Sequence, residues 1–191
     1  VGFADRLIAK IKLFERRIDE YEMLLDESTI WLVRLQGVGY AKAEDMVDAG
    51  VSGPNVRAAG VNYDVRWAHP YSVYDQVDWE PAVEKPTSVK GADCYDRYRV
   101  RMEEMRQSSK MILDAIEKIP GGKNTNYSSG DEMILTKAPT RAPEGATGFS
   151  NYECTRGASQ FYIQGGGEGR GKNPYRLSIR SPMFITIPYV A

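Results

Sequence analysis

One long amphipathic helix, predicted over residues 93–119, constrains the fold of this chain more than any other feature. Its apolar and small side chains recur at steps of three and four residues, at Tyr95, Tyr98, Met102, Met105, Ser109, Ile112, Ile116 and Ile119. Asp93 suits the N-cap position, and Pro120-Gly121-Gly122 ends the pattern. At about 1.5 Å per residue the helix is about 40 Å long and spans a small domain from side to side.

A second amphipathic helix is predicted over residues 3–25. Its apolar positions alternate steps of four and three, at Phe3, Leu7, Ile11, Phe14, Ile18, Tyr21 and Leu25. Charged residues occupy the opposite face at spacings that allow ion pairs. The stripe lasts barely three heptads, so one helix packed on a core is favoured over a coiled coil.

Between these helices, residues 28–79 read as short segments separated by glycine and proline. Ala41–Ala49 is predicted to form a two-turn helix that Gly50 ends, and Pro54 indicates the start of another. The stretch from Arg57 to Trp79 is irregular but rich in charged and aromatic side chains. We expect it to lie against a core or a partner, with its arginines and aspartates paired.

The last quarter of the chain is predicted to be β-structure. Strands are expected at residues 152–155, 160–163 and 175–180, and the glycine-rich residues 165–173 would join the last two as a hairpin. Residues 123–148 read as a linker, with a possible short strand at Met133–Leu135. The predicted fold class is therefore α+β: a single lobe with a helical part (1–122), a linker (123–148) and a small antiparallel sheet (149–191).

Composition excludes several functional classes for this 191-residue chain. Net charge is −1, and no segment is strongly one-signed, so neither nucleic acid nor an anionic membrane surface is an expected partner. No apolar run approaches the roughly 20 residues of a membrane span, and the first residues do not resemble a secretory signal. The absence of an initial methionine and the apolar residues 184–191 lead us to expect that this sequence is a piece of a longer one.

Local motifs for cofactors are weak. Gly166–Lys172 resembles a phosphate-binding loop, but Asn173 replaces the required hydroxyl residue and a strand pattern follows where a helix is needed. His69, the only histidine, is expected to make a structural hydrogen bond. Cys94 and Cys154 lack the partners of an iron–sulfur site and are interpreted as buried, inert thiols. No catalytic, cofactor-binding or metal-binding residue is assigned.

A set of charged residues close to apolar ones is the one candidate site, comprising Arg57, Asp64, Arg66, Asp75, Asp93, Arg97 and Glu103. Buried charges are costly unless they are paired, so these residues are expected to form ion pairs. One interpretation is a structural salt-bridge network. The other is a proton-coupled network that responds to redox change in a neighbouring subunit.

Three ordered blocks of sequence contain further recognisable stretches, at Gly37–Gly39, Ala43–Asp45, Gly53–Arg66, Pro70–Asp78, Asp93–Tyr98, Val100, Glu103–Ser108, Glu153–Gly157, Tyr162, Asn173–Arg176 and Ile179–Phe184. In this order the stretches resemble the D-type subunit, the hydrogenase-like large subunit of complex I-type NADH:quinone oxidoreductases. Residues 123–148 are shorter than in members that insert helices there, and the pattern drifts after Phe184.

The resemblance implies part of a nickel–iron hydrogenase large-subunit-like fold. It also implies a place beside the small iron–sulfur subunit, other peripheral-arm subunits and the membrane arm, on the cytoplasmic face of the membrane. There the large subunit shapes the cavity in which quinone takes electrons from a partner-held iron–sulfur cluster, in a reaction coupled to proton translocation. The family's quinone-headgroup histidine and tyrosine precede the start of this chain, so this fragment is expected to bind no cofactor and to be inactive alone.

Two other functions remain open from the sequence. One is the large subunit of a membrane-bound nickel–iron hydrogenase or a reduced-deazaflavin dehydrogenase, relatives of the same family. A hydrogenase would need two C-x-x-C pairs near the ends of the complete subunit. The other is a catalytically silent scaffold subunit.

Overall fold

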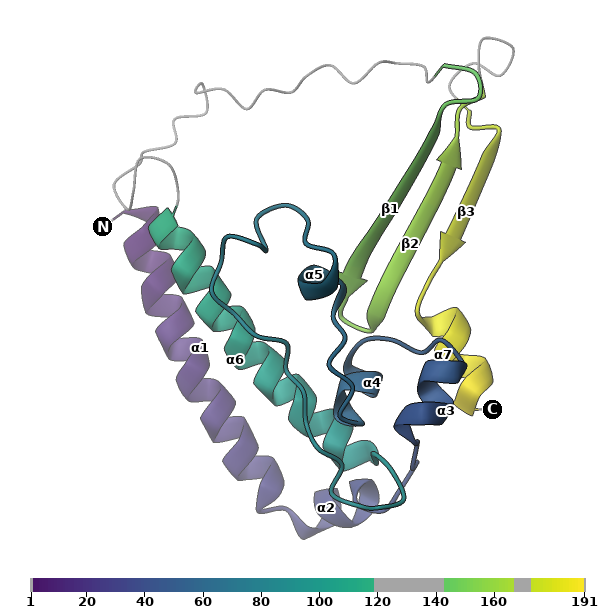
Figure 1. The fold of residues 1–191 in the computed structure, drawn as a ribbon. Coiled ribbons are helices and arrows are strands. Elements are labelled where there is room, and N and C mark those ends of the chain that lie inside the picture. Colours follow the sequence, from purple (N-terminus) through teal and green to yellow (C-terminus); the bar gives the residue numbers. More distant parts are fainter. Residues whose placement is uncertain (1, 119–142, 167–172, 191) are drawn as a thin grey trace.

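The computed structural model describes residues 2–118, 143–166 and 173–190 and shows an α+β arrangement, as predicted (Figure 1). Two long helices lie on one side and a three-stranded antiparallel sheet on the other, with short helices between them. The helices are α1 (Phe3–Asp26), α2 (Thr29–Leu35), α3 (Ala43–Asp48), α4 (Pro54–Ala58), α5 (Val65–Ala68), α6 (Cys94–Lys118) and α7 (Met183–Val190). The strands are β1 (Thr147–Cys154), β2 (Gly157–Gln164) and β3 (Arg176–Arg180). None of the helices within these ranges is long and apolar enough to cross a bilayer.

Helices α1 and α6 confirm the two long helices predicted from periodicity, and they run side by side in opposite directions (Figure 1). Ile11 and Ile18 of α1 are buried, and α1 packs against both α6 and α2. Arg106 of α6 adds ion pairs to Asp19 and Glu22 of α1. Other members of the predicted apolar face stay exposed, with Phe3 at 66% and Tyr21 at 50%. Thus α6 covers only part of the apolar stripe of α1.

Asp93 caps α6, as predicted. Its Oδ1 accepts hydrogen bonds from the backbone N–H groups of Tyr95 (2.8 Å) and Asp96 (3.0 Å), and its Oδ2 accepts one from Gly37 (2.8 Å). The Asp96 carboxylate accepts in return from the backbone N–H of Asp93 (3.1 Å), which completes a reciprocal capping box. The cap therefore also ties the loop before α3 to the start of α6.

Replacing Asp93 with alanine is expected to destabilise the protein by about 1–2 kcal/mol, because three backbone donors lose their acceptor. Asp93→Asn keeps an acceptor oxygen and should cost less. The measurement is the urea midpoint for proteolysis of the subunit. A midpoint for Asp93→Ala equal to that of the unsubstituted protein would show that the cap contributes nothing.

The buried face of α6 differs from the predicted stripe. Asp96 and Val100 are fully buried, whereas Ile112 is 38% exposed. The reason is that α6 packs on two sides, against α1 and α2 and also against α4. A single apolar stripe read from the sequence describes only one of these contacts.

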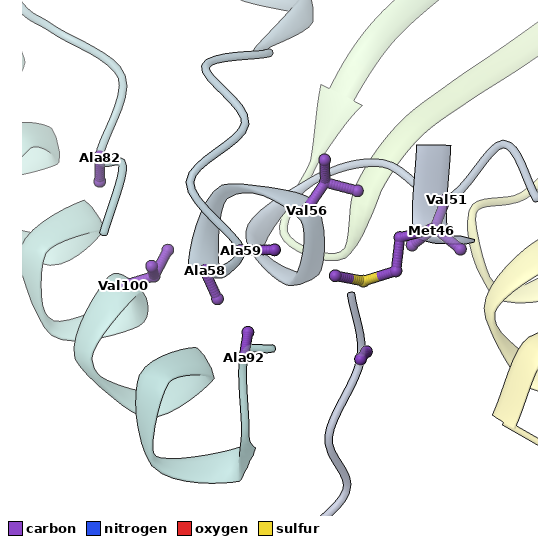
Figure 2. Packing of buried hydrophobic residues seen from close by; sticks show 9 residues of the cluster. Met46, Val51, Val56, Ala58, Ala59, Ala82, Ala92 and Val100 are labelled. Carbon is purple, nitrogen blue, oxygen red and sulfur yellow. The ribbon is translucent and has the colours of Figure 1, made fainter. Parts of the chain in front are cut away.

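The hydrophobic core lies where α3, α4 and the start of α6 meet, and it is built mainly from small side chains. Val100 of α6 faces Ala58 of α4, with Ala92 below them and Met46 and Val56 on the far side (Figure 2). Alanines at the contact allow the backbones to approach closely, and Ala41 and Ala92 exchange two 2.9 Å backbone hydrogen bonds. The core is therefore formed where short elements pack together at the N-terminal end of α6.

The short helices of the middle segment form where glycine and proline predicted them. Helix α3 ends before Gly50, whose φ is +75°, and Pro54 lies at the first turn of α4. Helix α2 was not predicted; Ser28 caps it by accepting from the Trp31 N–H. The expectation that the irregular stretch lies against a core is met in part, since Val65 and Trp79 are buried while Trp67 is 55% exposed.

The three predicted strands are present in the order β1-β2-β3, and each neighbouring pair is antiparallel. β1 begins at Thr147, inside the predicted linker, because its pairing with β2 continues to Gln164. The register places Ile163 beside Leu177 and Phe161 beside Ile179 on one face, where Ile163, Leu177 and Ile179 are about half exposed. The possible strand at Met133–Leu135 and the proline–glycine end of the long helix lie outside the described residues.

The last described element, α7, was not predicted. Ile185, Thr186, Ile187 and Pro188 favour extended structure over helix. Ile185 and Tyr189 nevertheless pack against the core cluster, and Thr186 Oγ1 donates to the carbonyl of Pro182 (3.0 Å). Tertiary packing thus overrides local preference in this segment.

An aromatic group at the α2–α6 contact contains a buried hydroxyl without a hydrogen bond. The Trp31 and Tyr98 rings meet edge to face with centroids 5.6 Å apart, and the Tyr98 hydroxyl has no hydrogen-bond partner among the described residues. Burial, followed by the charges of Asp26 and Glu22, raises the pKa of Tyr98 to about 12. The phenol is therefore held in its neutral form.

Tyr98→Phe is expected to leave stability unchanged or raise it by up to about 1 kcal/mol below pH 10, because it removes an unpaired buried hydroxyl. The folded pKa lies above the unfolded value of 10.0, so the stability due to the neutral phenol is complete below pH 10 and is lost as pH rises toward 12. Urea midpoints on either side of pH 10 test this. Tyr95→Phe is the matched control, since the Tyr95 hydroxyl donates to Asp26 (3.2 Å).

Candidate functional site

Arg57 is the centre of a buried cluster of charges between α4, α5, α6 and β1. Its side chain is 1% exposed, and its Nη1 lies 3.2 Å from Asp64 Oδ2 and 3.0 Å from Glu153 Oε1. Its Nε donates to Glu104 Oε1 (3.1 Å), and its Nη1 also donates to the carbonyl of Tyr63 (3.0 Å). One guanidinium group thus joins carboxylates from three different elements. We call Arg57, Asp64, Arg66, Glu104 and Glu153 the Arg57 cluster.

Asp64 connects Arg57 to Arg66. It caps α5 by accepting from the Arg66 backbone N–H (2.9 Å), and it accepts two side-chain hydrogen bonds from Arg66, at Nε (2.9 Å) and Nη2 (2.7 Å). The paired fork geometry is the strong form of a guanidinium–carboxylate contact. Burial lowers the pKa of Arg66, but the Asp64 hydrogen bonds and charge outweigh this and leave that pKa above its usual value. The Arg66 guanidinium also lies 4.7 Å from the ring centroid of Trp79.

Glu104 and Glu153 complete the cluster, and sequence reasoning missed both. Glu104 lies one turn after the buried Val100 on α6, a spacing that could have indicated its position. Glu153 is near the end of β1, 3% exposed, and its Oε2 accepts from the Val65 backbone N–H (3.3 Å). Burial is the main cause that raises the pKa of Glu153; Arg57 opposes this rise and Asp64 adds to it.

A close backbone contact positions β1 against the helices. Gly53, just before α4, packs on Gly157, the first residue of β2, and Ser52 Oγ accepts from the Ala158 N–H (2.9 Å). A Cβ on Gly53 would lie 2.3 Å from the Gly157 Cα, so only glycine fits. This contact brings Glu153, four residues before Gly157, to Arg57.

The structure separates the seven predicted charged residues into two groups. Arg57, Asp64 and Arg66 meet in the cluster. The other four lie elsewhere. Asp93 caps α6, Glu103 accepts from Gln107, and Asp75 is exposed. Arg97 donates to the carbonyls of Gly39 (2.7 Å) and Ala92 (3.2 Å) and to Cys94 Sγ (3.1 Å). The seven do not form one contiguous site.

The remaining candidate residues make no site in the described ranges. His69 is exposed, and its backbone N–H donates to the Val65 carbonyl (2.9 Å), whereas no ring hydrogen bond is found there. Cys94 and Cys154 are free and only half-buried, which corrects the expectation of buried thiols. Most of Gly166–Lys172 lies outside the described residues, but β3 follows where a phosphate loop would need a helix. No group of three metal-ligating side chains occurs within residues 2–118, 143–166 and 173–190.

Chemically, the Arg57 cluster can hold charge and exchange protons. A cavity of about 170 Å³ adjoins it, lined by Arg57, Arg66, Glu104, Glu153 and by Ser108, Cys154 and Thr155. Its hydroxyl and charged walls suit water molecules, since a buried water needs two to four polar partners. The arrangement links α4, α5, α6 and β1 through ion pairs between three carboxylates and two guanidinium groups.

Comparison with known proteins shows similarity over the whole chain. The family model described as the 49 Kd subunit of respiratory-chain NADH dehydrogenase matches residues 1–191. A D-type subunit of the NADH-quinone oxidoreductase of Chloroherpeton thalassium is 38% identical over 201 residues, which cover 96% of this chain and 44% of that protein. The H-type subunit of the NAD(P)H-quinone oxidoreductase of a Synechococcus strain is 34% identical over 202 residues, which cover 97% of this chain and 49% of that protein. The chain thus spans about half the length of these relatives.

A solved structure shows the same arrangement. A chain of the membrane-bound sulfane sulfur reductase, an archaeal respiratory membrane complex, aligns with a TM-score of 0.73 and 28% sequence identity, covering 94% of this chain and 46% of that one. The family-model match and the identities therefore agree with the blocks identified in the sequence. This chain belongs to the family of the 49 Kd subunit of respiratory-chain NADH dehydrogenase, the family of the D-type subunits of the quinone oxidoreductases.

Proposed function

We propose that this chain is part of a core subunit of a respiratory NADH:quinone oxidoreductase. In this proposal the core subunit, together with the small iron–sulfur subunit, shapes the cavity in which quinone is reduced, on the cytoplasmic face of the membrane. The family match over residues 1–191 is the observation that carries the proposal. The 33–38% identity to subunits of quinone-reducing complexes supports it further.

The physical contribution of this part of the subunit would be a rigid, charged wall. The Arg57 cluster joins α4, α5, α6 and β1 through side chains that are mostly inaccessible to water. Paired charges at low dielectric respond strongly to a change of charge nearby. The Arg57 cluster is therefore the part of the chain that we propose to couple electron transfer to proton movement, with the iron–sulfur and quinone chemistry supplied by the rest of the complex. Its fold would be part of the hydrogenase large-subunit type.

The proposal is tested in the organism's own membranes. Deleting the gene should abolish quinone-dependent NADH oxidation, and the full-length gene should restore it. A copy limited to residues 1–191 should restore nothing, because its partner surfaces, such as the half-exposed Leu177 and Ile179 of the sheet, would be uncovered and prone to aggregation. Unchanged quinone-dependent oxidation in the deletion strain would overturn the proposal.

A second candidate follows from the solved relative. Because that structure belongs to a sulfane sulfur reductase, an assembled complex with a different terminal acceptor is the alternative. Supplying the purified complex with quinone, polysulfide or protons as acceptors separates these functions.

Nickel in that complex, together with C-x-x-C pairs at both ends of the complete gene, would indicate a hydrogenase. Turnover that does not depend on this subunit would indicate a scaffold.

A further inference from the structure

The Arg57 cluster holds more negative than positive charge. Three carboxylates, from Asp64, Glu104 and Glu153, surround two guanidinium groups, from Arg57 and Arg66. Arg57, Asp64 and Glu153 are between 0% and 3% exposed, so solvent screens them little. An unbalanced buried charge is unfavourable, and binding one proton would remove the imbalance.

The three carboxylates are not equally stabilised as anions. Asp64 receives two side-chain hydrogen bonds from Arg66, one from its backbone, and the Arg57 charge at 3.2 Å. Glu104 accepts hydrogen bonds from both Nε and Nη2 of Arg57, and its side chain is 21% exposed to solvent. Glu153 receives one guanidinium N–H and one backbone N–H at 3.3 Å, and is only 3% exposed. The proton is therefore best placed on Glu153.

A cavity of about 170 Å³ adjoins Glu153. Ser108 and Thr155 are among the residues that line it, and its volume can hold several water molecules. The other charged or titratable groups around Glu153 include Asp64 and Arg66 on the α5 segment, Arg57 on α4 and the Cys154 thiol, which lines the same cavity. Tyr71 is also close, and its hydroxyl accepts from the Glu153 N–H (3.2 Å). On α6, Glu104 faces Arg57, and Arg101 interacts electrostatically with Glu104, Arg57 and Arg156.

We propose that Glu153 is a proton-binding carboxyl that exchanges its proton with solvent through the adjacent cavity. This proposal about Glu153 deepens the proposed function, and the role of the proton rests on that function. In the assembled complex, the protonation of Glu153 would respond to changes of charge nearby. The elevated pKa that burial gives Glu153 agrees with this assignment. The step is a simple protonation of one carboxylate oxygen and needs no other reactant.

Infrared spectroscopy of the full-length subunit in its assembled complex tests the proposal. At a pH where an ordinary glutamate is ionised, the wild type should show the carbonyl band of a protonated carboxylic acid that shifts in D₂O. Glu153→Gln, which keeps the side-chain shape, should lose this band. Glu22→Gln, which removes a carboxylate paired with the half-buried Arg106, should retain it.

A second variant keeps the test decisive if Glu153→Gln does not assemble. Glu104→Gln frees Arg57 N–H groups for Glu153, so the band should titrate about one pH unit lower than in the wild type. A wild-type complex without any protonated carboxyl in that pH range, or a spectrum unchanged by Glu153→Gln, would overturn the proposal. The titration needs neither NADH nor quinone. Absence of the band would therefore overturn the proton site and leave the proposed function standing. Loss of quinone turnover would count against the proposed function and leave the titration result valid.

Discussion

Arg57→Ala is expected to destabilise this protein by about 3–5 kcal/mol, because it leaves carboxylates buried without their shared cation. Asp64 would retain Arg66, but Glu153 would keep only the Val65 N–H. Glu104 would keep its partial exposure to water and the charge of Arg101. The link between α4, α6 and β1 would be lost at the same time. We expect little of the variant subunit in the assembled complex, measured by its abundance in purified membranes and by the urea midpoint for proteolysis.

The control for Arg57 is Arg17→Ala. Arg17 pairs with Glu20 on the exposed side of α1, where both side chains are about half accessible to water. Exposed pairs contribute about 0–1 kcal/mol, so this variant should behave like the parent. If the two arginine variants had the same midpoint, the Arg57 cluster would not hold these elements together.

Gly157→Ala is expected to cost about 2–5 kcal/mol and to separate the sheet from the helices. Its φ of +124° is a conformation that a residue with a Cβ adopts at a cost of about 1–2 kcal/mol. The new Cβ would also lie 2.6 Å from Ser52 Oγ and 2.7 Å from the Ser52 carbonyl oxygen, and forcing such groups apart costs about 1–3 kcal/mol. The hydrogen bond from Ala158 N–H to Ser52 would break as these backbones part.

Gly145→Ala provides the matched control for this contact. Gly145 also has a positive φ, +72°, but a Cβ there would meet no atom within 4 Å. Its substitution carries the conformational cost alone, so the difference between the two variants measures the close packing of Gly157 on Ser52. Urea midpoints for proteolysis of the subunit give both values. Equal losses in the two variants would contradict the role of the Gly157 contact in joining the sheet to α4.

The elements predicted well are those whose signals are local. Periodicity over more than twenty residues predicted α1 and α6, and Asp93 marked the start of α6. Gly50 marked the end of α3, and Pro54 marked the start of α4. These signals depend on backbone geometry within one or two turns, which the sequence states directly. Helix α7 shows the opposite case, because residues with poor helical preference form a helix where Ile185 and Tyr189 pack on the core.

The candidate site was predicted only in part for a related reason. Asp64 and Arg66 are two residues apart, and Arg57 is seven residues before Asp64, so their association was readable from one stretch of sequence. Glu153 is 96 residues from Arg57 and reaches it only because Gly53 packs on Gly157. The charge and the apolar neighbours that selected Arg57, Asp64 and Arg66 also selected four other residues. These four, Asp75, Asp93, Arg97 and Glu103, have other partners or face solvent.

The α+β class, the two long helices, the three strands and, through the ordered blocks, the family of the chain all follow from the amino-acid sequence. Which charges meet and which apolar faces are covered follows only from the packing of distant elements. Helix periods, caps and turns are set by neighbours in the chain, whereas the ion pairs of Arg57 depend on backbones about one hundred residues apart fitting together at two glycines.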